Sequence, residues 1–170
     1  MPESSLDGRM TGAELLVIRE TLGLTGPWIA RVVGTATRNE RRWEADDYRV
    51  PDHASQKVYE LANFAEQAVD DLVARCRLVN VPRGTPGVIL YRNDDTYARN
   101  APPGEPYPAR WHRAIAGRAL DRVPGLRIAF FTDDVLREPD SDVCWFKFAA
   151  STRQVDLTEY VQPTRLEAPR

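Results

Sequence analysis

Residues 22–44, LGLTGPWIARVVGTATRNERRWE, contain the signals that decide the fold of the N-terminal part of this chain. Thr25 belongs to the residue types that cap helices, and Pro27 follows it where the first turn of a helix tolerates proline. Gly34 is placed to end that short helix, as a C-terminal glycine does. A further helix is predicted over residues 37–45. Two short helices joined by a Gly/Thr turn are typical of a helix-turn-helix.

The residues upstream predict one more helix. Thr11 and Glu14 have the spacing of a capping box, and apolar residues then recur at helical spacing up to Gly23. Trp43, at the other end of the motif, is predicted to lie in the core. Residues 1–10 are polar and are expected to form a flexible tail.

A long helix is predicted from about residue 53 to residue 79, with Asp52 as its cap. It is too long for a bundle of three short helices to cover. Its apolar stripe is therefore buried either within the chain alone or also against a second copy in a dimer. The stripe consists of Val58, Ala62, Ala65, Val69, Leu72, Cys76 and Val79.

The C-terminal half has a different pattern, with short apolar runs separated by Pro- and Gly-rich segments. Residues 81–87 are predicted to form a loop, and the runs after it predict the order β-α-β-β. The predicted elements are a strand at 88–91, a helix at 109–122 and strands at 126–131 and 143–148, with residues 93–104 as a connection. Such a small sheet needs a covering helix or a partner sheet.

The predicted fold class is thus α+β, with an N-terminal all-α helix-turn-helix bundle, a long connecting helix and a small C-terminal β-α-β-β unit. The expected divisions are the tail at 1–10, the helix-turn-helix domain at 11–52, the long helix at 53–80, a small α+β domain at 81–150 that would dimerise, and a C-terminal extension at 151–170.

Composition restricts the function classes. The 170 residues have a net charge of −2, so the overall charge does not indicate a nucleic-acid partner. From residue 31 to residue 42, however, four arginines stand against one acid, Glu40. The sequence shows no transmembrane span and no signal peptide, and its two cysteines lack paired spacing, so we expect a cytoplasmic protein.

The chain resembles the DNA-binding domain of lambda-repressor-like (Cro/CI, XRE-type) regulators over about residues 11–65. The residues that carry the resemblance are Leu15, Arg19, Leu22-Gly-Leu-Thr25, Ile29-Ala30, Val33-Gly34, Arg42-Trp-Glu44 and Val50-Pro51. The longer layout resembles a subgroup with a C-terminal dimerisation domain, which includes anti-CRISPR-associated repressors. The chain departs from the family pattern in four places. Gly26 replaces a phosphate-contacting Gln, Ala36 replaces Ser, Glu40 replaces an apolar residue and Asp46 replaces Gly.

A helix-turn-helix places its second helix in the major groove, where Arg and Asn side chains pair with guanine and adenine. The candidate DNA-binding residues are Thr37, Arg38, Asn39, Arg41, Arg42 and Arg31. Among them, Arg38, Asn39 and Arg42 are expected at base edges, and Arg41 and Thr37 at bases or phosphates. The alternative is a solvated face whose arginines pair with Glu40 and Glu44; Glu44 is also a candidate structural partner of Arg19.

These observations predict a sequence-specific transcriptional regulator, a repressor that binds double-stranded DNA as a homodimer on a palindromic operator. The alternative is a protein-interaction module, such as an antitoxin or adaptor, whose helix-turn-helix does not bind DNA on its own. His53 and His112 stand in separate segments, without acids at metal-ligand spacing, and no nucleophile–base pair is visible. We therefore expect no enzymatic activity, no metal and no cofactor; nothing in the sequence indicates a small-molecule effector or a membrane partner.

Overall fold

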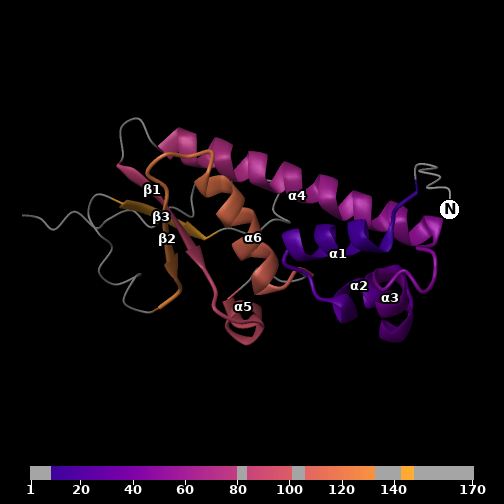
Figure 1. Ribbon diagram of the computed structural model, residues 1–170. Helices are drawn as coiled ribbons and strands as arrows, with labels where there is room; N and C mark the ends of the chain where they lie inside the picture. The colour runs from indigo at the N-terminus through magenta and orange to yellow at the C-terminus, as the bar shows by residue number, and fades with distance from the viewer. Residues whose placement is uncertain (1–8, 80–83, 101–105, 133–142, 148–170) are drawn as a thin grey trace, which may run out of the picture. The chain divides into compact units, whose positions relative to one another are not determined.

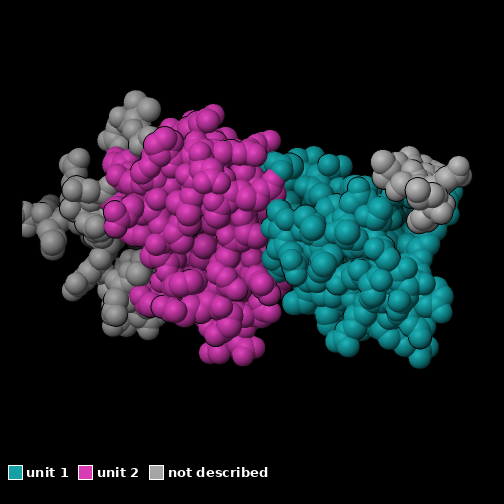
Figure 2. Space-filling model, viewed as in Figure 1, with its two compact units in different colours: residues 1–67 teal, residues 68–170 magenta. Residues whose placement is uncertain are grey.

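The computed structural model describes residues 9–79, 84–100, 106–132 and 143–147 (Figure 1). The chain forms two compact units, residues 1–67 and residues 68–170 (Figure 2). The boundary falls inside the long helix, α4 (Asp52–Val79), so this helix contributes to both units. Most of the predicted tail and all of the predicted C-terminal extension lie outside the described residues. The α+β fold class with a long helix is confirmed.

Unit 1 contains three short helices and the first part of α4. They are α1 (Gly12–Thr21), α2 (Gly26–Val33) and α3 (Thr37–Glu44). Helix α3 packs against both α1 and α2. The three residues between α2 and α3 form the predicted turn, so α2 and α3 make a helix-turn-helix arrangement.

Local signals define the helix ends as the sequence predicts. Thr11 Oγ1 accepts a hydrogen bond from Glu14 N at 3.1 Å, and Glu14 Oε2 accepts one from Thr11 N at 2.7 Å. This reciprocal pair is the predicted capping box. Thr25 Oγ1 accepts from Trp28 N at the start of α2, and Gly34 ends α2 with a φ of +75°. At such a φ a residue with a Cβ would be strained.

The core of unit 1 contains apolar side chains from the three short helices and from the first part of α4. Leu15, Ile29 and Trp43 are buried from α1, α2 and α3 in turn. The apolar stripe of α4 completes this core and continues into unit 2. Ala62 is half-buried, the side chain of Val79 lies outside the described part, and the other stripe residues are buried: Val58, Ala65, Val69, Leu72 and Cys76. Further buried residues of α4 are Ala54, Leu61, Ala68 and Val73. Most of the stripe is thus buried within the chain, and its additional burial against a second copy stays a prediction.

Asp46, just after α3, links the end of that helix to the start of α1. It has a φ of +58°, a left-handed conformation that Asp tolerates better than most residues do. Asp46 Oδ1 accepts a hydrogen bond from Gly12 N at 3.0 Å. A Cβ on Gly12 would lie only 2.0 Å from the carbonyl oxygen of Trp43, so α1 and α3 can approach this closely only with glycine there.

Gly26 and Glu40 form a second complementary pair. A Cβ on Gly26 would lie 2.5 Å from Oε2 of Glu40 and 2.8 Å from Oε1. The Glu40 carboxyl group therefore occupies the space over the first residue of α2. Gly26 and Glu40 thus fit each other, because a side chain at position 26 would displace the acid at position 40.

Unit 2 has a three-stranded sheet with the order β2-β1-β3, and both pairings are parallel. The register runs from Gly87↔Arg127 to Leu90↔Phe130 on one side of β1, and from Thr85↔Val143 to Ile89↔Lys147 on the other. Helix α6 packs against β1. The elements of this unit, after the end of α4, are β1 (Thr85–Leu90), α5 (Asp94–Asn100), α6 (Ala109–Leu120), β2 (Arg127–Phe130) and β3 (Val143–Lys147).

Two predictions for this half were wrong. Residues 93–104 were expected to be a connection, but α5 occupies 94–100, because Asn93 Oδ1 accepts a hydrogen bond from Thr96 N and so caps a helical turn. Strand β1 begins at Thr85, inside the predicted loop. The sequence predicts Gly87 to lie in a loop, yet it lies in the strand, where the Trp145 ring packs against it. A Cβ at position 87 would lie 2.6 Å from that ring, so only glycine leaves enough space.

No helix in the described ranges combines the length and apolar character needed to cross a membrane.

The Gly26–Glu40 pair predicts a specific double-mutant result. Gly26→Ala should lower the free energy of unfolding in the wild-type chain but not in a Glu40→Ala background, with a coupling of about 1 kcal/mol or more. Urea denaturation of the four proteins measures this coupling. Gly12→Ala is the matched control, since its Cβ meets backbone rather than Glu40, and its cost should be the same in both backgrounds. Additive effects of Gly26→Ala and Glu40→Ala would contradict the prediction.

Candidate nucleic-acid interface

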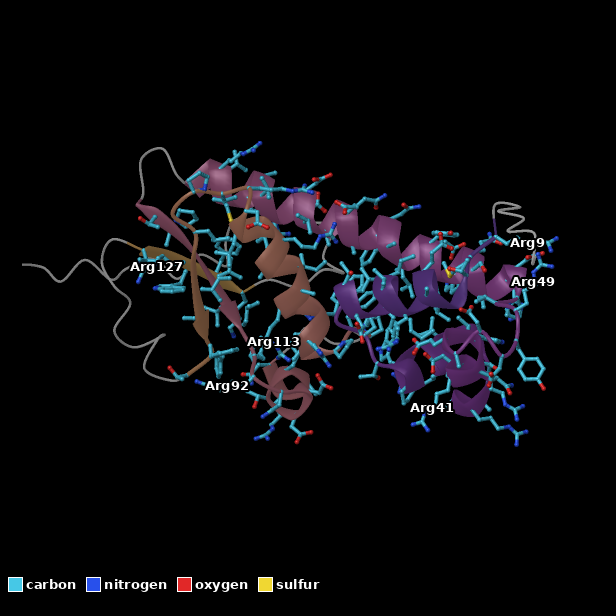
Figure 3. The ribbon with its side chains drawn as sticks, viewed as in Figure 1. Arg9, Arg41, Arg49, Arg92, Arg113 and Arg127 are labelled. Atoms are coloured by element: carbon cyan, nitrogen blue, oxygen red, sulfur yellow. The ribbon has the colours of Figure 1, made fainter. Side chains whose placement is uncertain are left out.

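Helix α3 has two faces of opposite character. Glu40 and Trp43 are buried, whereas Arg38, Arg41 and Arg42 are exposed. Residues three and four positions apart are neighbours on a helix surface, so the three arginines share one face. Figure 3 shows the side chain of Arg41 extending away from the ribbon.

The remaining predicted residues lie at the margins of this face. Thr37 is half-buried at the first position of α3, and Arg31 is exposed in the last turn of α2. Because α2 packs against α3, Arg31 belongs to the helix-turn-helix. Its contribution to the same face as the α3 arginines stays a prediction.

The side-chain amide of Asn39 already makes one hydrogen bond within the protein. Its Nδ2 donates a hydrogen bond to Thr35 Oγ1 at 3.1 Å. A bidentate contact with adenine needs both the amide oxygen and an amide N–H. The remaining N–H and the oxygen can still be presented, but only in the orientation that Thr35 permits. Ala36 is the N-cap of α3 and makes no side-chain cap bond.

A surface hollow of about 450 Å³ lies beside α3. It is lined by Asn39, Arg42, Trp43, Tyr48 and Arg49. The guanidinium groups of Arg42 and Arg49 and the hydroxyl group of Tyr48 could bind an anionic group such as a backbone phosphate.

Sequence reasoning missed Tyr48 and Arg49. They lie in the segment after α3 that reads only as a break in helix periodicity. The guanidinium carbon of Arg42 lies 5.2 Å from the centroid of the Tyr48 ring, within cation–π range, while Tyr48 is 58% exposed. A tyrosine followed directly by an arginine, six positions after Arg42, is the sequence signal that could have identified these two residues.

The acids of α3 do not pair with its exposed arginines. Arg19 of α1 donates from Nε to Glu44 Oε1 at 2.5 Å and from Nη2 to Glu44 Oε2 at 3.2 Å. The structural role expected for Glu44 is thus confirmed. The third nitrogen, Nη1, donates to the carbonyl oxygen of Leu24 at 3.0 Å. The hydrogen bonds to Glu44 raise the pKa of the Arg19 guanidinium.

Glu40 is also withdrawn from the surface. Burial raises the pKa of its carboxyl group to about 7, and the neighbouring Glu44 carboxyl group adds to the shift. Near neutral pH, Glu40 therefore offsets less positive charge on the outer face than its count in the sequence suggests. Asp46 and Asp47, by contrast, are exposed just after α3.

The histidines and cysteines have other surroundings. His112 is buried, with Nε2 3.0 Å from the Tyr97 hydroxyl and Nδ1 3.1 Å from the Pro108 carbonyl oxygen. Cys76 and Cys144 are buried and unbridged, and burial raises the pKa of the Cys76 thiol to about 11. In the described ranges, no three His, Cys, Asp or Glu side chains are grouped so that they could hold a metal ion.

Comparison with known proteins gives no match, either to a family model or to a curated protein sequence.

Replacement of Arg19 tests whether its ion pair holds α3 in place. Arg19→Lys keeps the charge but cannot grip both Glu44 oxygens and the Leu24 carbonyl oxygen at once. We expect the free energy of unfolding to fall by about 2 kcal/mol in urea denaturation, because buried partners lose their donors. Arg9→Lys is the control, since Arg9 pairs with an exposed Asp52 at 3.7 Å and should change stability by less than about 0.5 kcal/mol. Equal effects of the two substitutions would refute this role.

Proposed function

We propose that this protein is a sequence-specific, DNA-binding transcriptional regulator, a repressor that acts as a homodimer on a palindromic operator. One observation carries the proposal: α3, the second helix of a helix-turn-helix, presents three arginines on its exposed face while its two acids are turned inward. The position of the arginines on that helix matters more than their number, since the whole chain has a net charge of −2.

The arrangement fits the way a helix-turn-helix binds its site. The N-terminal part of the second helix enters the major groove. Arg38 and Asn39 stand in the first turn of α3, where they can meet base edges. Arg42, which the sequence analysis expects at base edges, stands one turn further and lines the same hollow as Arg49, so we assign this pair to a phosphate instead. Arg41 lies between them on the exposed face.

The homodimer follows from the size of such a contact. One short helix reads only a few base pairs, and a two-fold dimer would read two half-sites spaced by about 34–36 Å. The chain's mass in solution, measured by light scattering during size-exclusion chromatography, should be twice that of one chain. A monomer that is retained by one protein partner and not by DNA would favour the interaction-module alternative.

The arginines provide the direct test. Duplexes that bind the full chain are first selected from a random-sequence pool, and the affinity of an enriched duplex is then measured by fluorescence anisotropy. Arg38→Ala, Arg41→Ala and Arg42→Ala should each weaken binding by about 5- to 100-fold, because each removes a charged base or phosphate contact. The affinity of the wild-type chain should also fall steeply with salt.

The matched control is Lys57→Ala, which removes an exposed cation from α4 in the same unit and should leave the affinity unchanged. Failure to enrich any duplex, or arginine variants that bind as tightly as the wild type, would rule out the proposed function.

A further inference from the structure

Glu40 occupies an unusual position for an acid on a helix that faces outward with arginines. Its exposure is 1%, on the inner face of α3. Its Oε1 atom has no hydrogen-bond partner in the part of the chain that the structure describes. A buried carboxylate without such a partner is strongly disfavoured relative to the neutral acid.

The cation nearest to Glu40 is already engaged. Arg19 Nε lies 3.7 Å from Glu40 Oε1, too far for a hydrogen bond. The same nitrogen donates to Glu44, and Glu20 Oε1 lies 3.9 Å from Arg19 Nη2. Three carboxyl groups therefore face one guanidinium, and Glu40 is the most deeply buried of them.

The other groups around Glu40 do not supply the missing charge. From α2 it meets Gly26, whose lack of a Cβ makes room for the carboxyl group. From α3 itself, Glu44 forms a side-chain hydrogen bond with the protonated Glu40 and repels the ionised form, whereas Arg41 attracts the ionised form. An ionised Glu40 would thus add a second buried negative charge at the point where α3 meets α1 and α2.

We propose that Glu40 is a positioning residue whose carboxyl group must carry a proton for α3 to stay seated against α1 and α2. The DNA affinity of the exposed arginines then falls as the pH rises through neutrality, a consequence that rests on the proposed function. The pKa of Glu40, raised to about 7 chiefly by burial, puts this proton in the physiological range.

The direction of the effect follows from proton linkage. An unperturbed Glu has a pKa of about 4.3. Between that value and about pH 7, the folded unit retains a proton that the unfolded chain has released. Stability therefore falls with rising pH across this window, and the loss is complete above about pH 7. The folding equilibrium constant can change by at most about tenfold per pH unit for one proton.

The first measurement compares urea unfolding of the full-length wild type and Glu40→Gln from pH 5 to pH 8.5. The amide stays neutral, so the stability of Glu40→Gln relative to wild type should rise with pH up to about pH 7 and then level off. Glu60→Gln is the control, because Glu60 is exposed on α4 and should give a pH profile parallel to that of the wild type.

The second measurement localises the effect. Hydrogen exchange of α3 amides, corrected for the intrinsic pH dependence, should show less protection at pH 8 than at pH 6 in the wild type, and a smaller change in Glu40→Gln. The affinity for a selected duplex at constant salt should fall between these pH values by about threefold or more relative to Glu40→Gln, because fewer molecules hold α3 in place.

Glu44→Gln keeps the proposal testable if Glu40→Gln does not fold. Without the Glu44 charge, Arg19 is released toward Glu40, so the pH window of destabilisation should move to lower pH. Parallel unfolding profiles for the wild type and the variant measured, Glu40→Gln or Glu44→Gln, would overturn the proposal, as would α3 protection in the wild type that is independent of pH. If no duplex binds at any pH, the proposed function fails, while unfolding and exchange still decide the role of Glu40.

Discussion

The guanidinium of Arg19 is the interaction on which the N-terminal unit depends. Its three nitrogens bind the carboxylate of Glu44 and the carbonyl oxygen of Leu24, so one side chain of α1 holds both the end of α3 and the chain that leads into α2. Such a fork is available to Arg and not to Lys. Because Glu44 is bound inward, the exposed arginines of α3 are not paired with it.

Two glycine–acid pairs set how closely the helices approach around this ion pair. Gly12 allows α1 to meet the end of α3, where Asp46 accepts its N–H, and Gly26 leaves space for Glu40. Asp46 adopts a left-handed backbone conformation, and the Glu40 carboxyl group fits the space left by the absent side chain at position 26.

Burial of acidic side chains makes the net charge of the chain a poor guide to the charge on the exposed face of α3. The net charge of the chain is slightly negative. At α3, however, the arginines are exposed to solvent, whereas Glu40 is buried and Glu44 is half-buried. A buried acid with a raised pKa carries less negative charge near neutrality than an exposed one. The proposed function and the proposed role of Glu40 both depend on this separation, which follows from packing and not from composition.

The sequence by itself determined the elements whose signals are local. Capping residues, Pro27, Gly34 and the long apolar stripe predicted the helices of the N-terminal unit and α4, because hydrogen bonds between near neighbours and helical periodicity decide them. It also predicted six candidate residues for one surface, of which five lie on α3 and Arg31 lies on α2. Only the three-dimensional structure decided which side chains meet and which are buried: the hydrogen bond from Asn39 to Thr35, the hollow lined by Tyr48 and Arg49, and the burial of Glu40 against Gly26. Distant partners decide the start of α6 and the parallel sheet, since Asp94 accepts a hydrogen bond from Ala109 N fifteen residues away and Trp145 covers Gly87 from another strand. Contacts of this kind leave no periodic trace in the sequence.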